Sequence, residues 1–204
     1  MGDVGTDHAF LPVYAVLNGY ADKAVASDIN KGPIERAKKH ISEYGLNDRI
    51  ETRLCPGLEK YEKGECDLIV IAGMGGNLIA EILDKSPDVA RSADKLVLSP
   101  NSCESDLRKY LYENGYDIIS ESAVSEGKHQ YLVMTVKYTG NIRNVSETVC
   151  YIGEKLLDQT DDEDVRAYLN KLKRKITVRM NGLKKAEHFD SDQFELLQKI
   201  LRSL

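Results

Sequence analysis

The stretch CDLIVIAGMGGNLIAEIL, residues 66–83, decides the fold of this 204-residue chain. Its first eight residues, Cys66–Gly73, form an almost continuous apolar run, which is typical of a parallel strand buried on both faces. A glycine-rich turn follows, and residues 76–86 are predicted to form a helix. This strand–turn–helix unit predicts an α/β protein built on a parallel sheet.

The alternation of strand and helix extends in both directions from this unit. Strands are predicted at residues 23–29, 49–54 and 94–100, and helices at residues 31–45 and 102–115. Residues 116–124 and 130–138 follow with only a turn at 125–129 between them, which predicts an antiparallel pair. The alternation implies a doubly wound parallel sheet. The closing antiparallel strand favours the class I methyltransferase variant of this Rossmann-like architecture over the plain dinucleotide-binding one.

The first strand of such a sheet is central, and Asp3 is its expected last residue. The chain therefore begins almost at the loop that follows this strand. A central strand reduced to a stub would leave its two neighbours with unpaired backbone groups. We therefore expect an upstream helix and the rest of this strand to belong to the natural protein.

The pattern changes after Tyr138. Apolar residues at helical spacing predict helices over residues 145–156 and 165–183, and the polar turn between them predicts an antiparallel hairpin. A last short helix is expected at residues 191–204. We therefore divide the chain into an α/β domain, residues 1–140, and a coiled-coil-like helical tail, residues 141–204. The tail is too small for a large core of its own, so we expect it to dock on the first domain or on a partner.

Composition limits the location and the partners of the protein. The chain has 42% hydrophobic and 30% charged residues, and no apolar run approaches the roughly 18 residues that span a bilayer. No signal peptide is visible, so we expect a cytoplasmic protein that does not bind membranes. The four cysteines and four histidines are scattered along the chain. This favours reduced thiols over disulfides and gives no support to a metal site.

Charge is unevenly distributed along the chain, whose formal net charge is −5. The interval from Lys171 to Lys185 contains seven basic residues and no acid. A basic strip of this kind is compatible with a phosphate-bearing partner. Charge alone nevertheless favours a solvated helix face.

Residues compatible with a nucleoside ligand follow four of the predicted strands, whose carboxyl ends meet at one edge of the sheet. Gly5 lets the backbone approach a ligand closely, and Asp28 is placed to accept hydrogen bonds from ribose hydroxyls. The turns at residues 72–76 and 99–102 complete this edge. Each feature also has a structural explanation, since glycine turns are common and Asp28 can cap the next helix. Together they favour S-adenosylmethionine over NAD, because the G-x-G-x-x-G fingerprint is absent.

Three segments carry a family resemblance. DVGTDHAFLP (3–12), AGMGGNLIAEIL (72–83) and SPNSCESDLRKYL (99–111), with the helical tail, resemble the bacterial TrmK family, the tRNA adenine-22 N1-methyltransferases. The resemblance covers essentially the whole chain. It implies a class I methyltransferase fold, S-adenosylmethionine bound by the first domain, and an adenine in the D-arm region of tRNA as substrate. The tail would then help to hold the tRNA through Lys171, Lys173, Arg174, Lys175 and Arg179.

The resemblance also implies roles for residues around the cofactor. The methionine end of S-adenosylmethionine would be lined by Asp3, Gly5, Thr6 and His8. The ribose and the adenine would be held by Asp28 and Ile29. The transfer site would be framed by Ala72, Gly73, Met74 and Gly75, with Pro100 and Asn101 beside it.

One loop departs from the family pattern. The loop after the third strand usually reads G-D-G-L, and its acid contacts the amino group of the cofactor adenine. This chain has Cys55, Pro56, Gly57 and Leu58 there. Pro56 offers neither a side-chain acceptor nor an amide hydrogen. Adenine recognition would then rest on backbone groups and apolar walls.

Two residues are candidates for acting on the target base. Adenine N1 is already a nucleophile at neutral pH, so the protein mainly has to align it with the methyl group. Asp7 is expected to stabilise the positive charge of the methylated base, and Asn101 to orient the base edge. The residues leave alternatives open: a methyltransferase of this fold with another substrate, or a non-catalytic module that binds tRNA or a partner. An NAD enzyme is disfavoured, and a monomer or weak homodimer is expected.

Overall fold

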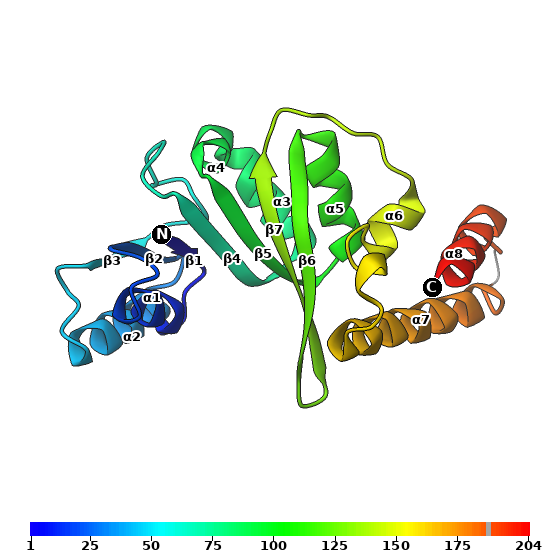
Figure 1. The fold of residues 1–204 in the computed structure, drawn as a ribbon, viewed down its shortest axis with the longest axis horizontal. Helices are drawn as coiled ribbons and strands as arrows, with labels where there is room; N and C mark the ends of the chain where they lie inside the picture. The colour runs from blue at the N-terminus through cyan, green and yellow to red at the C-terminus, as the bar shows by residue number, and fades with distance from the viewer. Residues whose placement is uncertain (187–188) are drawn as a thin grey trace.

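A computed structural model describes residues 1–186 and 189–204 of the chain. Its centre is a seven-stranded sheet with the strand order β3-β2-β1-β4-β5-β7-β6, and helices flank both faces of the sheet (Figure 1). The first five strands are parallel, and β7 pairs with β5 in the antiparallel direction. The predicted doubly wound sheet with a terminal antiparallel strand is therefore confirmed.

The parallel half of the sheet carries the predicted ligand loops. Its strands are β1 (Gly2–Val4), β2 (Ala24–Asp28), β3 (Ile50–Leu54), β4 (Leu68–Gly75) and β5 (Lys95–Ser102). Although β1 has three residues, it pairs with β2 on one side and β4 on the other. Asp3, for example, lies opposite Ala26 and Val70. The first strand is therefore central, as predicted.

Helices cover the two faces of the sheet unequally. One face carries α1 (Phe10–Leu17) and α2 (Lys31–Glu43), which pack on β2 and β3 around small residues such as Ala26 and Ala37. The other face carries α3 (Gly76–Lys85), α4 (Pro87–Ser92) and α5 (Glu104–Glu113) in a larger apolar core. The sequence patterns predict α2, α3 and α5. They miss α1 and α4, which are too short to show a clear helical period.

The antiparallel pair is a long hairpin of β6 (Tyr116–Glu126) and β7 (His129–Tyr138). Pairing continues to Glu126 opposite His129, so the turn is shorter than the expected segment 125–129. Gly127 makes this tight turn possible because its φ is +57°. β7 pairs with β5 only near Met134, and the hairpin tip projects beyond the carboxyl ends of the parallel strands (Figure 1).

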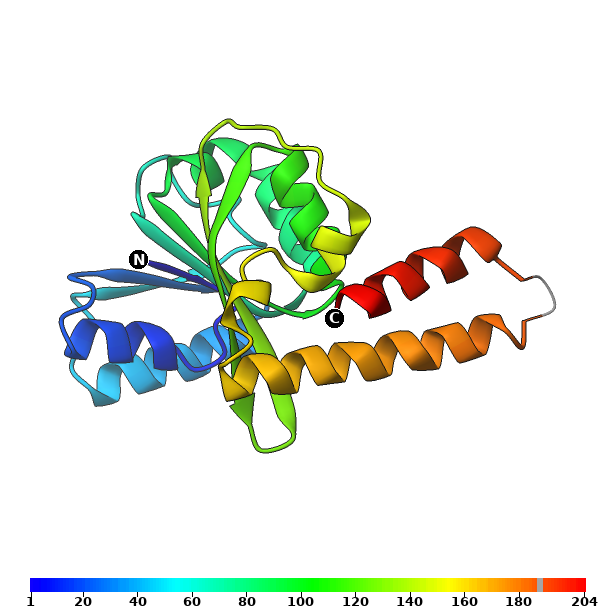
Figure 2. The same ribbon diagram turned by 45° about the vertical axis from the view of Figure 1, so that its right-hand side comes forward.

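The helical tail differs from the predicted arrangement. It consists of α6 (Glu147–Ile152), a short 3-10 turn η1 (Leu157–Gln159), α7 (Glu163–Leu183) and α8 (Ser191–Ser203). The hairpin expected between residues 145–156 and 165–183 is wrong, because the first of these segments stops being helical after Ile152. The long helix α7 instead pairs with α8, which also packs on α6 (Figure 2).

A buried ion pair explains why the first tail helix ends so early. The side chains of Arg108 in α5 and Glu121 in β6 are both fully buried, with Nε and Oε1 2.7 Å apart. Arg108 also donates to the carbonyl oxygens of Cys150 and Tyr151 at 2.8 and 3.2 Å. The next turn holds Gly153 at φ +95°, where a Cβ would lie 2.6 Å from a Glu121 carboxylate oxygen. The chain therefore leaves the helical path at Gly153.

The tail docks on the α/β domain, which agrees with one of the two expected alternatives. Ile152, Val165 and Leu197 are buried in the same apolar cluster as Leu98 of β5. Within the described residues, no helix combines the length and the apolarity needed to cross a bilayer.

Candidate active site

A cleft of about 300 Å³ lies at the carboxyl ends of β1, β2 and β4, beside the loop after β3. The strand order reverses between β1 and β4, and open α/β sheets bind ligands at such a switch point. The cleft is lined by seven of the residues predicted to bind the cofactor: Gly5, Asp28, Ile29, Pro56, Gly57, Leu58 and Met74. The structure therefore brings together residues from four separate loops.

Gly5 forms the floor of this cleft. Its φ is +82°, and its amide hydrogen bonds to the carbonyl oxygen of Ser27, 2.8 Å away. A Cβ at this position would overlap the methyl group of Met74. The backbone at Gly5 is thus held open to the cleft in a conformation that favours glycine. A ligand can approach the main chain closely here.

Asp28 and Ile29 form the rim at the end of β2. One carboxylate oxygen of Asp28 accepts the amide hydrogen of Asn30, the first residue before α2, at 2.7 Å. This contact closes a turn before α2 and is not the expected helix cap, because the N-cap of α2 is Asn30 and no side-chain cap hydrogen bond is present there. The same side chain lines the cleft, beside Ile29, whose surface is 64% exposed.

The segment from Cys55 to Leu58 forms the cleft wall on the β3 side. Gly57 has a φ of +54°, and a Cβ there would lie 3.0 Å from two carbon atoms of Ile82 in α3. Pro56 adds an apolar ring and has no amide hydrogen. The wall is therefore smooth and apolar where the family pattern has an acid.

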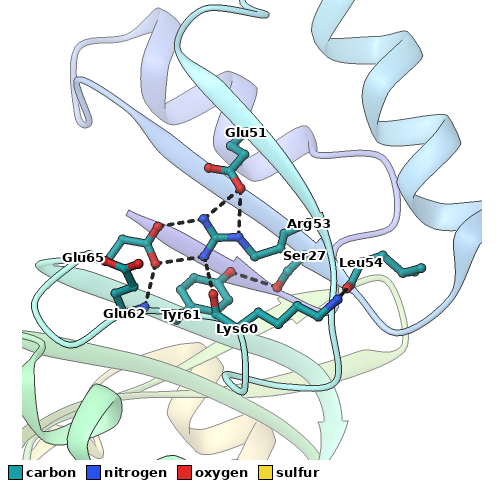
Figure 3. A network of polar contacts seen from close by, with 8 residues as sticks. All are labelled: Ser27, Glu51, Arg53, Leu54, Lys60, Tyr61, Glu62 and Glu65. Carbon is teal, nitrogen blue, oxygen red and sulfur yellow. Dashed lines mark hydrogen bonds and ion pairs between the residues drawn. The ribbon is translucent and has the colours of Figure 1, made fainter.

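A polar network behind this wall holds it in place (Figure 3). Arg53 donates to both carboxylate oxygens of Glu65, at 2.7 and 2.9 Å, and to the carbonyl oxygen of Lys60 at 2.9 Å. Tyr61 donates to the hydroxyl of Ser27 on β2 at 2.8 Å. The sequence does not predict this network, because its polar residues form no recognisable motif and Ser27 joins it from a different strand.

Several predicted residues lie beside the cleft rather than in its lining. Asp3 is 9% exposed, and burial raises the pKa of its carboxyl, an effect partly offset by Thr6. The hydroxyl of Thr6 accepts the amide hydrogen of Ala9 at 3.1 Å. The end of β4 is fixed by Asn101, whose side-chain amide donates to the carbonyl oxygen of Gly73 at 2.8 Å. Ala72 and Gly75 lie in the same part of β4 as Gly73.

Asp7 and His8 lie further out, on the exposed loop before α1. Asp7 forms an ion pair with Arg36 of α2, and it also lies 3.4 Å from the Nε2 atom of His8. The hydrogen bond from Arg36 lowers the pKa of Asp7. The ring of His8 stacks on Phe10, with centroids 5.1 Å apart. Neither Asp7 nor His8 lines the cleft.

A basic groove lies between the β6–β7 hairpin and α7. It is lined by Lys128, Gln130, Ala167, Asn170, Lys171, Arg174, Lys175, Val178 and Arg179. Four of the five residues predicted to contact tRNA therefore share one surface. Lys173 lies outside the groove, because it is about 200° around the helix from Lys171. Lys128 joins the groove from the hairpin, and the sequence strip gave no sign of it.

The groove contains few acids that could neutralise it. Lys171 donates to the carbonyl oxygen of Gln130 at 3.0 Å. This contact does not neutralise the charge of Lys171, because a carbonyl group is uncharged. Lys175 lies 3.6 Å from Glu104, and Arg179 donates to the hydroxyl of Tyr151 at 3.2 Å. The surface is therefore suited to an anionic partner.

The sheet order, the antiparallel last strand and the cleft at the strand ends define a class I methyltransferase fold. Within this class the family is shown by sequence. The model of the TrmK family, described as tRNA (adenine(22)-N(1))-methyltransferase, matches residues 1–203. The chain belongs to this family, and the resemblance seen in its motifs is confirmed.

Individual relatives agree with this result. The tRNA (adenine(22)-N(1))-methyltransferase of Bacillus subtilis is 43% identical over 137 residues, which cover 67% of this chain and 58% of that protein. The crystal structure of the B. subtilis TrmK matches with a TM-score of 0.84 and 31% identity, over 98% of this chain and 91% of that chain. A putative tRNA (m1A22) methyltransferase of Streptococcus pneumoniae, solved with S-adenosyl-L-methionine, matches with a TM-score of 0.84. It is 29% identical, over 98% of this chain and 91% of that chain.

Proposed function

We propose that this chain transfers a methyl group from S-adenosylmethionine to N1 of an adenine in tRNA, at position 22. The observation that carries the proposal is the placement of two surfaces at one edge of the sheet. An apolar cleft is built around Gly5 and Asp28. The basic groove shares Gln130 and Lys171 with a hollow that reaches Pro100 and Asn101 at the end of β5. Family membership names the substrate.

The cleft has the features that S-adenosylmethionine requires. The open backbone at Gly5 suits the amino-acid end, and the Asp28 carboxylate would accept hydrogen bonds from ribose hydroxyls. Ile29, Pro56 and Leu58 offer apolar surface to the adenine. When bound, the cofactor supplies an electrophilic methyl group on a sulfonium. The chain's own task is then to bring adenine N1 into line with that methyl group.

Asp7 and Asn101 are proposed to act on the target base. Because Arg36 lowers the pKa of Asp7, this carboxylate stays ionised at neutral pH and is a weak base. It is therefore suited to stabilising positive charge on the methylated adenine rather than to removing a proton. Its ion pair with Arg36 must loosen for this role. Asn101 would orient the base edge through its position against Gly73.

The proposed tRNA contacts are Lys171, Arg174, Lys175 and Arg179, with Lys173 contributing least. A target adenine stacked within folded tRNA must leave its stack to reach the cleft, at a cost of a few kcal/mol. Phosphate contacts along the groove would supply binding energy to offset that cost. A tRNA substrate also implies a cytoplasmic site of action. We further infer a monomer or weak homodimer, which sedimentation velocity would test.

Mass spectrometry of tRNA incubated with the protein and S-adenosylmethionine tests the activity directly. We expect N1-methyladenosine at position 22, and none in a tRNA carrying guanosine there. Asp7→Ala should retain binding of S-adenosylhomocysteine in calorimetry and lose methyl transfer, whereas Asp22→Ala, an exposed control, should retain both. Binding of S-adenosylhomocysteine without methylated tRNA would instead point to another substrate. No binding of S-adenosylhomocysteine at all would point to a non-catalytic module.

A further inference from the structure

The tip of the β6–β7 hairpin presents two aromatic rings that the proposed mechanism does not use. His129 and Tyr131 are both exposed, and they lie on the same face of β7 because side chains two residues apart share a face. Their ring centroids are 6.3 Å apart. The buried side chains of Leu132 and Met134 anchor the part of β7 that follows the rings. The rings are thus held at a fixed site outside the sheet.

This aromatic pair lies between the strand ends and the basic groove. A hollow of about 260 Å³ is lined by His129 and Tyr131 on one side and by Pro100 and Asn101 on the other. Lys171 and Gln130 line this hollow and also line the basic groove. The two concave surfaces are therefore continuous. They lead from the end of β5, past the aromatic pair, to the cations of α7.

The chemistry of the hollow fits one nucleotide of an RNA strand. Bases that have left a helix stack on aromatic side chains in many RNA-binding proteins. Lys171 lines the hollow together with the rings, and Lys128, the neighbour of His129 in the chain, lines the adjoining groove, so both could contact phosphates of the same strand. Glu104, the acid in this hollow, already lies near Lys175. Aromatic faces bordered by cations favour a nucleotide over an acidic peptide, which would have no use for two exposed rings.

We propose that His129 and Tyr131 form a stacking platform for a base next to the target adenine, and that Lys128 and Lys171 hold the adjoining phosphates. The proposal rests on the proposed function, because it names a further contact for the same tRNA substrate. Stacking a neighbouring base at the hairpin would hold the strand open and keep the target adenine directed toward Asn101. His129 and Tyr131 are therefore positioning residues.

Replacement of Tyr131 tests the platform. Tyr131→Leu should weaken tRNA binding about tenfold, the loss expected for one stacked base, and Tyr131→Phe should bind like the wild type. The salt dependence of binding should be unchanged in Tyr131→Leu, because the tyrosine contacts no phosphate. In contrast, Lys128→Gln should reduce the salt slope by about one. Tyr20→Leu is a matched control, since Tyr20 is 74% exposed at the opposite edge of the sheet.

The outcomes separate this proposal from the proposed function. Binding of tRNA by Tyr131→Leu within twofold of the wild type would overturn the platform, provided that the wild type methylates tRNA. Equal losses in Tyr131→Leu and Tyr131→Phe would also overturn it, because phenylalanine keeps the stacking surface. A wild type that binds tRNA but forms no N1-methyladenosine would contradict the proposed function instead. S-adenosylhomocysteine binding should be identical in all variants and would report any misfolding.

Discussion

The two ends of the sheet are held together in different ways. Around the cofactor cleft, the ionic contacts are partly exposed, as in the pair of Arg53 and Glu65, whose side chains are 14% and 25% exposed. At the other end, Arg108 and Glu121 are completely buried, and they join the sheet to the tail. The ion pair beside the cleft is therefore partly screened by solvent, whereas the pair at the tail end is not. The tail end has a joint that fixes where the basic groove lies relative to the strand ends.

The largest expected effect comes from breaking the buried joint. Arg108→Met leaves the Glu121 carboxylate buried without its partner, which should lower the free energy of unfolding by about 3–5 kcal/mol. The double variant Arg108→Met/Glu121→Leu should recover most of this loss, because no charge then remains buried. Urea-induced unfolding measures both. Lys38→Met, which removes an exposed ion pair with Glu35, should cost less than about 0.5 kcal/mol. A similarly small loss of unfolding free energy in Arg108→Met would show that the buried pair contributes no more to stability than an exposed pair.

A smaller effect is expected from filling the space that Gly153 leaves. Gly153→Ala places a methyl group against the carboxylate of Glu121 at a φ of +95°, so it should destabilise the protein by about 1–3 kcal/mol. Gly182 is a matched control inside α7, with open space around its Cβ position. Gly182→Ala should stabilise the helix by about 0.5–1 kcal/mol. Thermal unfolding of the two variants would show opposite shifts, and shifts of the same sign would count against a tight joint.

At the cleft end, Asp3 should make the stability of the protein depend on pH. Burial raises the pKa of Asp3, so the folded state binds this proton more tightly than the unfolded state. The contribution of Asp3 to stability is complete below its ordinary pKa of about 3.9, and it is lost as the pH rises through the raised value.

Asp3→Asn should therefore raise the unfolding midpoint at pH 7 by about 2–4 °C, or about 1 kcal/mol for a chain of this size. The same variant should match the wild type near pH 3. Circular dichroism at both pH values checks this, with the exposed Asp22→Asn as control. An Asp3→Asn variant that is less stable than the wild type at pH 7 would show that the charged carboxylate is stabilised in the fold.

The smallest expected effect distinguishes the face of α7 that lines the basic groove from the opposite face of the same helix. Lys171→Gln combined with Arg174→Gln should reduce the slope of log affinity for tRNA against log salt by about two, because two phosphate contacts are lost. Lys173→Gln should leave this slope nearly unchanged, since Lys173 lies outside the basic groove. Filter binding at several salt concentrations measures the slopes. Equal reductions per residue would mean that tRNA surrounds the helix rather than following the groove.

The two ends of the sheet also differ in how well their structure could be predicted from the sequence. Local patterns are enough to predict the parallel half of the sheet. The apolar run at 66–73 indicates a buried strand, and the loop around Gly5 indicates a turn that a ligand can approach. The ligand edge follows, because parallel strands bring their loops together. Seven of the predicted cofactor residues accordingly line one cleft.

The tail could not be predicted in this way. Gly153 ends the first helix because of Glu121, which is distant in sequence, so the apolar spacing of residues 145–156 gives a misleading helix. Likewise, a run of basic residues does not reveal that Lys173 faces away from Lys171, and nothing in the strip points to Lys128. The network of Arg53 behind the cleft wall is equally invisible, because it depends on tertiary contacts between ordinary polar residues.

The joint at Arg108 has a mechanical consequence. With 21 residues, α7 is about 31 Å long, and Val165 in its first turn is buried in the apolar core beside the sheet. A rotation of about 5° at that base would displace the far end of a rod of this length by about 3 Å, close to the spacing that decides whether a hydrogen bond forms. The far end of a long helix therefore stays in place only if its base is held rigidly. The buried pair of Arg108 and Glu121 holds the segment that leads into α7, through the carbonyl oxygens of Cys150 and Tyr151, and so helps to set the direction of the helix.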